Sequence, residues 1–582
     1  MSEIFGVFKI LPREQYLSCV GMLIAMLFGA LLEAVGIGAV LPLISLLGDP
    51  DFLGRYPIMA NLAASCGMRE HSDVIVTASL LLVGLYFLKN LYIGWESRLQ
   101  IRFTVKNQIY YAKALLAEYL MKPYLFHVNH NTATLIRNVS AGAQTVFAAI
   151  LTFVLQLLTE IVTALTIWAM LIMVDPFTAI VVAGVLSALL FSILRMFRRQ
   201  VVMQGVVQNN CAAQYAKWLH QSLGAIKETK IMHKEAFFLE EFRKAYTAFG
   251  EAQSKFTFLN QIPRNIIEFL VISGLMLLII GKTLAGGNPE SIISLLSVLA
   301  LAAFRLMPSA NRIVNFVNSI KYHMPLFHEL HGELMDIRER INRHEQIQIE
   351  GHSSKMQFVR EIVINRVGFS YPDATKEVLD DASFVIPKGA YVGIIGPSGA
   401  GKTTFVDILL GLLPPSKGSI SVDEQDIQTD IRGWQENLAY VPQSIYLIDA
   451  TIKENIALGE KLEEIDDAKI NKVLHMAELH DFVTELPNGI NTTVGEHGVK
   501  LSGGQRQRIG IARALYQEPE VLILDEATSA LDNATEKSIT NTILRLKGYM
   551  TIISIAHRVS TLVDCDFKVE FQQGRAKIVM GK

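Results

Sequence analysis

The sequence Gly396-Pro397-Ser398-Gly399-Ala400-Gly401-Lys402-Thr403 decides how the C-terminal part of this chain is interpreted. It fits the pattern G-x-x-x-x-G-K-[ST], a loop whose backbone N–H groups surround the phosphates of a nucleotide. The apolar run Val392-Gly393-Ile394-Ile395 before it predicts a buried strand, and a helix is expected to start near Lys402. Glycine lets the backbone approach phosphate closely, and a helix N-terminus attracts an anion. The pattern therefore predicts a strand–loop–helix unit that binds a nucleoside triphosphate.

Lys402 and Thr403 are the charged and hydroxyl-bearing members of this loop. A lysine at this position reaches the β- and γ-phosphates, and the hydroxyl after it binds Mg²⁺. We expect the nucleotide contacts of this segment to be Gly396, Pro397, Ser398, Gly399, Ala400, Gly401, Lys402, Thr403 and Thr404.

Two further strings follow the loop. Leu501-Ser502-Gly503-Gly504-Gln505 precedes a predicted helix, and Val521-Leu522-Ile523-Leu524-Asp525-Glu526 is an apolar run that ends in two acids. Together with the loop they resemble the nucleotide-binding domain of ATP-binding-cassette (ABC) proteins. The resemblance implies an α/β P-loop ATPase that uses ATP and Mg²⁺ and transfers a phosphoryl group to water.

The resemblance also implies roles in hydrolysis. Glu526 would polarise the attacking water, His557 would contact the γ-phosphate, and Gln443 would reach the metal or the water. Mg²⁺ would be held by Thr403, Gln443 and Asp525. A histidine after a buried strand can otherwise be a satisfied core group.

The remaining implied contacts concern adenine and a second subunit. Tyr371 would stack on adenine, although a lone tyrosine is more often a packing residue. In this family the nucleotide-binding domains of two subunits pair head to tail, so some residues would contact ATP held by the other subunit. These are Ser502, Gly503, Gly504, Gln505 and Asp532.

Ahead of this domain the chain is strongly apolar. Hydrophobic residues make up 51% of the sequence and the mean hydropathy is +0.33. The formal net charge of −2 gives no bulk basic field for nucleic acid. A membrane span needs about 20 residues, and apolar stretches of that length predict a six-helix all-α membrane domain with spans near 16–47, 74–94, 146–174, 177–197, 262–282 and 291–320.

Charge predicts how these spans are oriented. The segments 96–140 and 193–255 are rich in Lys and Arg, whereas 49–73 carries four acids and only Arg55 and Arg69. Because Lys and Arg favour the cytoplasm, the two basic segments are expected inside and 49–73 outside. Each basic segment has a short break, near 124–137 and 224–234, where a cross-piece is expected to couple to the ATPase. We therefore divide the chain into a membrane domain at 1–323, a linker at 324–355 and a nucleotide-binding domain at 356–582.

Six spans followed by one cassette resemble the exporter-type half-transporter of the ABC family. The resemblance implies a multi-pass membrane protein that works as a homodimer among membrane lipids. ATP would drive export, with no nucleic acid as partner. The alternatives to a transporter are a soluble ABC ATPase and a channel with an ABC nucleotide-binding domain.

Among the Lys and Arg residues within the predicted spans, the candidates for a functional role are Lys89, Arg264, Arg305 and Arg312. A charge inside a bilayer costs several kcal/mol, about 2.5–3.5 kcal/mol on insertion scales, so such residues are functional candidates. A cavity lined by them would attract an anionic amphipathic substrate, and guanidinium suits phosphate. The alternative is structural pairing with acids of the same bundle, which are Glu33, Glu160 and Glu268.

A narrower resemblance concerns the substrate. The strings that carry it are Leu32-Glu33-Ala34-Val35-Gly36-Ile37-Gly38, Lys122-Pro123-Tyr124, Pro263-Arg264-Asn265 and Phe304-Arg305-Leu306-Met307-Pro308-Ser309. They resemble bacterial lipid-linked oligosaccharide flippases, which implies a polyprenyl-pyrophosphate glycan as substrate and the bacterial inner membrane as location. A lipid A-type flippase and a peptide or drug exporter remain alternatives.

Overall fold

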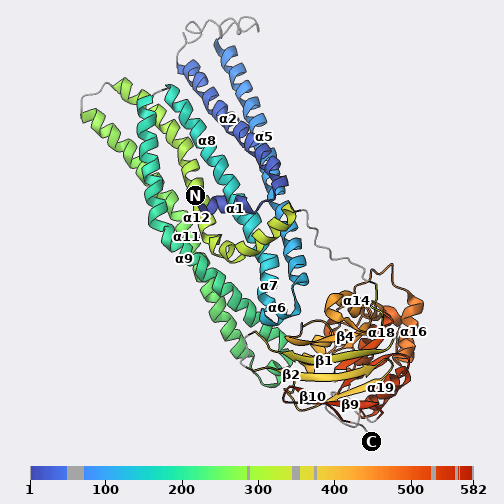
Figure 1. Ribbon diagram of the computed structural model, residues 1–582. Helices are drawn as coiled ribbons and strands as arrows, with labels where there is room; N and C mark the ends of the chain where they lie inside the picture. Colours follow the sequence, from blue (N-terminus) through green and yellow to red (C-terminus); the bar gives the residue numbers. More distant parts are fainter. Residues whose placement is uncertain are drawn as a thin grey trace. The chain divides into compact units, whose positions relative to one another are not determined.

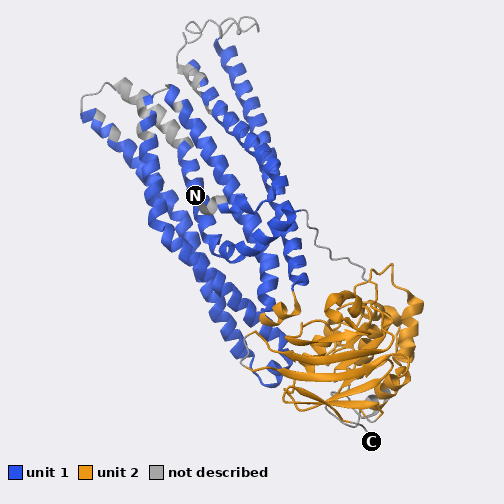
Figure 2. Ribbon diagram, viewed as in Figure 1, with its two compact units in different colours: residues 1–122, 130–349 blue, residues 123–129, 350–582 orange. Residues whose placement is uncertain are grey.

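The chain forms two compact units, which are described separately. The computed structural model describes residues 2–48, 71–174, 176–284, 289–343, 354–372, 376–525, 533–556, 562 and 564–579. Unit 1 comprises residues 1–122 and 130–349, and unit 2 comprises residues 123–129 and 350–582 (Figure 2).

Long helices build unit 1, and they coincide with the six predicted spans: α2 (Tyr16–Gly48), α5 (His71–Met121), α8 (Thr152–Val174), α9 (Pro176–Gly224), α11 (Glu235–Leu284) and α12 (Pro289–Asn342). Over the described residues, four stretches are long and apolar enough to cross a membrane: Arg13–Val40, His71–Met121, Thr132–Met170 and Glu235–Gly281. Large apolar side chains such as Leu81 and Phe87 are exposed on this unit. This is the surface expected of helices that face lipid rather than water.

The helices of unit 1 pack as one connected bundle, because α8 packs on both α2 and α12. Helix α9 packs on α11 and α12, while α2 packs on α5 and α8 (Figure 1). Helix α5 has 51 residues, which corresponds to about 75 Å at 1.5 Å per residue. A bilayer core is only about 30 Å thick, so these helices extend well beyond the membrane.

Short helices lie at both predicted breaks. The first break holds α6 (Tyr124–Asn129) and α7 (Thr132–Arg137), followed by the π-helical η2 (Asn138–Gly142) and η3 (Gln144–Leu151). Asn131 caps α7 by accepting a hydrogen bond from the Ala133 N–H at 2.9 Å. The second break holds α10 (Ile226–Ile231). Before the first span, α1 (Ser2–Ile10) and η1 (Arg13–Gln15) are tied down by the Tyr111 hydroxyl, which donates to the Ile10 carbonyl.

Unit 2 is built on a ten-stranded sheet in the order β5-β4-β1-β2-β10-β9-β3-β8-β7-β6. The strands are β1 (Glu361–Phe369), β2 (Leu379–Pro387), β3 (Tyr391–Ile395), β4 (Lys417–Val422), β5 (Gln425–Asp426), β6 (Leu438–Val441), β7 (Val521–Asp525), β8 (Thr551–Ile555), β9 (Phe567–Gln572) and β10 (Arg575–Val579). Strands β3, β8, β7 and β6 run parallel, whereas β1 pairs antiparallel with β2 and β4. Strands β7 and β8 are buried at every position, which fits strands covered on both faces.

Helices complete unit 2 and close its two hydrophobic cores. They are α13 (Lys402–Leu409), α14 (Ile431–Gln435), α15 (Ile452–Ile456), α16 (Asp467–Met476), α17 (His480–Glu485), α18 (Gly503–Tyr516) and α19 (Asn533–Leu546), with 3₁₀ turns η4 (Ile427–Thr429), η5 (Gly489–Asn491) and η6 (Glu496–Gly498). One core holds Trp434, whose indole N–H donates to the Leu409 carbonyl at 2.7 Å. Leu125 of α6 packs against this same core, so the first break contributes a helix to unit 2.

A close approach of α9 and α12 gives a test of the packing in unit 1. A Cβ atom added to Gly205 would lie 2.1 Å from the Tyr322 carbonyl oxygen, a contact that backbone cannot relieve. We expect Gly205→Ala to force the helices apart and to lower the stability of the full-length protein by about 1–3 kcal/mol, measured as thermal unfolding in detergent. The matched control is Gly250→Ala in α11, where nothing lies within 4 Å; equal melting of the two variants would contradict this packing.

Candidate active site

The candidate active site lies where four parallel strands of unit 2 end side by side. Register pairs Ile394 with Ile555, Asp525 with Ile555, and Val441 with Leu524. The segments that follow β3, β8, β7 and β6 therefore emerge at one edge of the sheet. Open α/β sheets bind their ligands at this carboxyl edge.

The loop after β3 has the backbone conformation that its glycines allow. Gly396 and Gly401 have φ of 145° and 97°, values that residues with a Cβ rarely adopt. A Cβ on Gly396 would lie 2.3 Å from the Phe571 carbonyl oxygen, and one on Gly401 would lie 2.9 Å from the Val378 carbonyl oxygen. Pro397, Ser398 and Gly399 are exposed whereas Ala400 is buried, so the middle of the loop is accessible to a ligand.

Lys402 and the two threonines after it begin helix α13. The Lys402 ammonium donates to the carbonyl oxygens of Gly396 and Pro397 at 2.6 and 3.0 Å, which holds its charge across the loop. Thr403 is exposed and Thr404 is buried. The Thr403 hydroxyl is thus available at the N-terminal turn of a helix, where phosphate and its counter-ion are favoured.

A carboxylate pair lies beside the loop. Asp525 ends β7 with 8% of its surface exposed and accepts a hydrogen bond from the Tyr440 hydroxyl at 3.2 Å. Asp407 of α13 is its neighbour, and burial, followed by the charge of Asp525, raises the pKa of Asp407 to about 6. Asp407 was not predicted from the sequence, although it is a single acid in the otherwise apolar run Phe405–Leu409.

Tyr371 lies at the same end of the domain. Its hydroxyl is 3.5 Å from the Thr404 hydroxyl, and its ring meets Phe369 edge-on with centroids 5.0 Å apart. Burial, then the charges of Asp407 and Tyr371, raise the pKa of Tyr124 on α6. Helix α6 therefore brings an aromatic hydroxyl near the acids of the site.

Gln443 is exposed two residues after β6, and the chain beyond it is tied to α18. The Arg513 guanidinium donates to the carbonyl oxygens of Asn455 and Tyr446 at 2.7 and 2.9 Å. The fully buried Asn455 amide donates to the Ile448 and Thr451 carbonyls at 3.0 and 3.1 Å and accepts from the Ile448 N–H. The segment carrying Gln443 and helix α18 are thus joined by one polar network centred on the buried Asn455, which was not predicted from the sequence.

Ser502 begins α18 with a reciprocal cap. Its hydroxyl oxygen accepts from the Gln505 N–H at 3.2 Å, and the Gln505 side chain accepts from the Ser502 N–H at 2.8 Å. Ser502 and Gly503 are exposed, and Gly504 is half-buried. A hydroxyl that accepts one bond keeps its proton for another, so capping leaves Ser502 able to donate to a phosphate.

Two of the cations predicted for the substrate cavity are paired within unit 1. Lys89 is buried on α5 and donates to Glu33 of α2. The Arg312 Nε of α12 lies 2.6 Å from Glu160 Oε1 of α8, with 49% of the arginine side chain and 14% of the glutamate side chain exposed. Structural pairing with Glu33 and Glu160, the alternative raised from the sequence, is therefore present for these two residues.

Arg264 lies exposed on α11, as does Glu268. The Arg305 side chain lies outside the described part of the chain, although its position belongs to α12. Glu526, Asp532 and His557 also lie outside the described residues; β7 ends directly before Glu526, and β8 ends two residues before His557.

Comparisons with known proteins agree with this geometry. The family model described as ABC transporter matches residues 379–529. The ATP-dependent lipid A-core flippase of Cupriavidus metallidurans is 30% identical over 465 residues, covering 78% of this chain and 76% of that protein. This chain belongs to the ABC transporter family.

Other similar proteins cover different shares of the chain. The lipid A-core flippase of Cupriavidus pinatubonensis is 41% identical over 217 residues, 37% of each chain. The heterocyst differentiation ATP-binding protein HepA of a Nostoc species is 35% identical over 305 residues, 50% of each chain. The chain thus spans at most half the length of these two relatives in the match. A solved structure of a bacterial Atm1-family ABC exporter with ATP bound is 25% identical, has a TM-score of 0.70 and covers 94% of both chains.

The predicted class and fold are confirmed. The chain is an exporter-type ABC half-transporter, with a helical membrane domain and an ATP-hydrolysing α/β P-loop domain.

The network around Asn455 gives a test of the site. We expect Asn455→Ala to leave buried donors and acceptors unpaired and to destabilise the protein by about 2–4 kcal/mol, seen as a lower melting temperature. Asn471→Ala is the matched control, because Asn471 is exposed on α16 and makes one bond to the Asp467 carbonyl. Unchanged melting of Asn455→Ala would show that the network does not hold this segment.

Proposed function

We propose that two copies of this chain form an ATP-driven flippase in a bacterial inner membrane. It moves an anionic amphipathic lipid, in the first instance a polyprenyl-pyrophosphate glycan, from the cytoplasmic to the outer side. ATP closes the paired ATPase domains and turns the membrane cavity outward, and hydrolysis resets it. The observation that carries the proposal is the match over 78% of the chain to a protein named as a lipid flippase.

The chemistry of the ATP site supports the first step. Lys402 binds the β- and γ-phosphates, and the loop amides held by Gly396 and Gly401 surround them. Glu526 orients and polarises the water that attacks the γ-phosphate, while His557 and Gln443 hold the γ-phosphate and that water. The oxygen donors of Thr403, Gln443 and Asp525 fit Mg²⁺. When bound, Mg²⁺ supplies charge neutralisation to the phosphates.

The exposed start of α18 supports the homodimer. One chain carries one phosphate loop and one Leu-Ser-Gly-Gly-Gln segment at 501–505. Each ATP site is therefore completed by a second copy, through its Ser502, Gly503, Gly504, Gln505 and Asp532. Two identical chains most simply form such a pair around a two-fold axis.

The substrate proposal rests on the cations of unit 1. Arg264, Arg305 and Arg312 lie on two consecutive long helices, and Lys89 lies on a third. Guanidinium groups bind phosphate through paired hydrogen bonds. Lipid A-core is the second candidate substrate, because the two Cupriavidus relatives are named for it.

The first test concerns the catalytic carboxylate. We expect Glu526→Gln to lower ATP hydrolysis in proteoliposomes at least a hundredfold while nucleotide still binds, because a neutral amide cannot polarise water. Phosphate release and binding of a fluorescent ATP analogue measure the two effects. Full turnover by this variant would refute the role of Glu526.

The second test separates substrate contact from ion pairing. We expect Arg312→Gln to abolish translocation of a polyprenyl-pyrophosphate glycan and to destabilise the protein, because Glu160 loses its partner. The double variant Glu160→Gln/Arg312→Gln removes both charges and is expected to regain the wild-type melting temperature but not translocation.

Restored translocation in the double variant would show that Arg312 serves Glu160 alone. The same proteoliposomes loaded with lipid A-core or with peptides identify the substrate class, since only the transported compound stimulates ATP hydrolysis and crosses the membrane. Stimulation by peptides alone would overturn the lipid proposal.

A further inference from the structure

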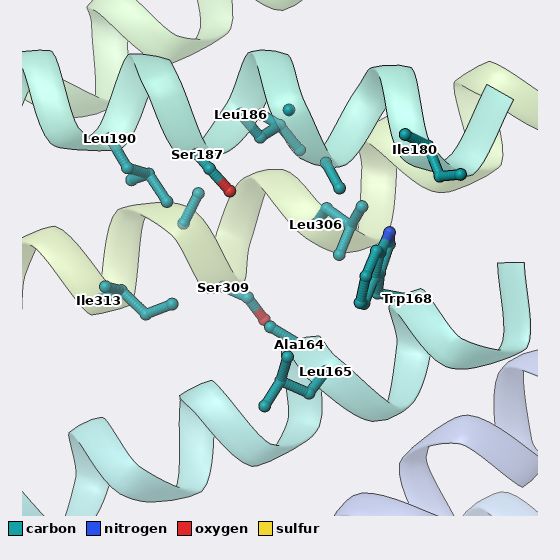
Figure 3. Close-up of a pocket in the computed structure, with 13 residues that line it drawn as sticks. Ala164, Leu165, Trp168, Ile180, Leu186, Ser187, Leu190, Leu306, Ser309 and Ile313 are labelled. Atoms are coloured by element: carbon teal, nitrogen blue, oxygen red, sulfur yellow. The ribbon is translucent and has the colours of Figure 1, made fainter. Parts of the chain in front are cut away.

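Two cavities in unit 1 are both lined by helices α9 and α12. The first has a volume of about 360 Å³ and lies between α8, α9 and α12. Its walls are mostly apolar, and Figure 3 shows Trp168 and Leu165 of α8 opposite Ile180 and Leu190 of α9, with Leu306 of α12 between them. The cavity lies within the predicted membrane spans, so it is suited to a hydrocarbon chain.

The second cavity is cationic. It has a volume of about 390 Å³ and lies between α9 and α12 alone. Its basic lining residues are Arg195, Arg198, Arg199, Lys321 and His328. Helix α9 has no Asp or Glu from Pro176 to Gly224, and the three arginines form no ion pair with any residue that the structure describes.

Helical periodicity places both cavities on one face of the α9–α12 pair. Eleven residues are close to three turns of an α-helix. This interval separates Gly184 from Arg195 on α9 and Ile313 from Met324 on α12, where the first residue of each pair lines the apolar cavity and the second lines the cationic one. The offset is about 16 Å along the helices, which is comparable to the length of a lipid chain.

The charge lies at the depth of lipid headgroups. The three arginines lie at the C-terminal end of the apolar stretch 177–197. Because Lys and Arg are enriched on the cytoplasmic side of membrane proteins, this end of α9 is expected at the cytoplasmic side. Arginine forks match the oxygens of a phosphate. Leu190 lines the apolar cavity, and the apolar residues Phe191 and Leu194 follow it on α9 before Arg195.

We propose that the two cavities form one docking site for a phosphate-headed lipid of the cytoplasmic leaflet. The phosphate binds Arg195, Arg198 and Arg199 together with Lys321, and one hydrocarbon chain runs along α9 and α12 to end against Trp168. This inference rests on the proposed lipid translocation, because it names where such a lipid loads. Its test needs no ATP and no transport.

The test uses the full-length protein in detergent, titrated with phosphatidic acid whose chains carry bromine. Bromine quenches nearby indoles, so the signal of Trp168 is taken as the difference between wild type and Trp168→Phe. We expect saturable quenching by phosphatidic acid and much weaker quenching by phosphatidylcholine with the same chains. Inorganic phosphate should compete far less well than unbrominated phosphatidic acid, because it has no chain.

Two variants probe the two ends of the site. The triple variant Arg195→Gln/Arg198→Gln/Arg199→Gln should weaken the affinity for phosphatidic acid at least tenfold. Gly184→Leu should fill the apolar cavity and remove the quenching of Trp168; nothing lies within 4 Å of a Cβ at Gly184, so the helix accepts it.

The matched control is Arg98→Gln/Arg102→Gln/Lys106→Gln, which removes three exposed positive charges from α5 just beyond its own apolar stretch. Its affinity should stay within twofold of wild type. Melting temperatures verify that every variant is folded.

The site would be refuted if the two triple variants lost equal affinity for phosphatidic acid, or if Gly184→Leu left the quenching of Trp168 unchanged. It would also be refuted if phosphatidylcholine bound as tightly as phosphatidic acid, or if inorganic phosphate displaced the brominated lipid as effectively as unbrominated phosphatidic acid does. Quenching without lipid translocation would refute the proposed function and leave this site standing. Translocation without quenching would do the reverse.

Discussion

The parallel pairing of β3, β8, β7 and β6 is the constraint on which the chemistry of this chain depends. Each strand is short and apolar, and each delivers a different polar group to the same edge: the phosphate loop, the segment before His557, Asp525 and the segment of Gln443. A shift of one residue in any of these strands would move each of its side chains to the opposite face of the sheet and would displace the polar group at its end. The register that protects the core therefore also fixes the spacing of the catalytic groups.

Helix α6 adds a link between that edge and the membrane-spanning part of the chain. It follows the 51-residue helix α5 directly in sequence, yet Leu125 packs into the core of unit 2 and Tyr124 lies near Asp407. The hydrogen bonds between the buried Asn455 and Arg513 supply a second link, between the Gln443 segment and α18. Packed contacts and buried hydrogen bonds have few alternative arrangements. Both links are suited to transmit a change at the phosphates.

The sequence was sufficient for features that depend on local pattern. The glycines at 396 and 401 required their backbone conformation, the apolar runs predicted six long helices, and proline after Lys122 ended α5. It was insufficient where the partner lies far along the chain. Lys89 and Glu33 are 56 residues apart, and Arg513 and Asn455 are 58 apart. No periodicity joins such residues, because tertiary packing selects one pairing among several that the composition allows.

The ion pairs inside unit 1 limit how the predicted cavity can work. Removing one member of a fully buried ion pair costs about 3–5 kcal/mol, and the cost is smaller for Arg312 and Glu160 because water reaches half of the arginine side chain. Glu160 is much less exposed than Arg312, so an anion that took the arginine would leave a half-buried carboxylate without its partner. A pyrophosphate, with two groups that can accept paired hydrogen bonds from several guanidinium forks, offsets this cost better than a single carboxylate does. Binding of an anion to the exposed arginines of the α9–α12 cavity does not break an ion pair on α9, since α9 contains no Asp or Glu. Binding of a lipid at the cytoplasmic side therefore costs less free energy than binding at Arg312. In the proposed transport, the first binding step is thus less selective among anions than the later step at Arg312.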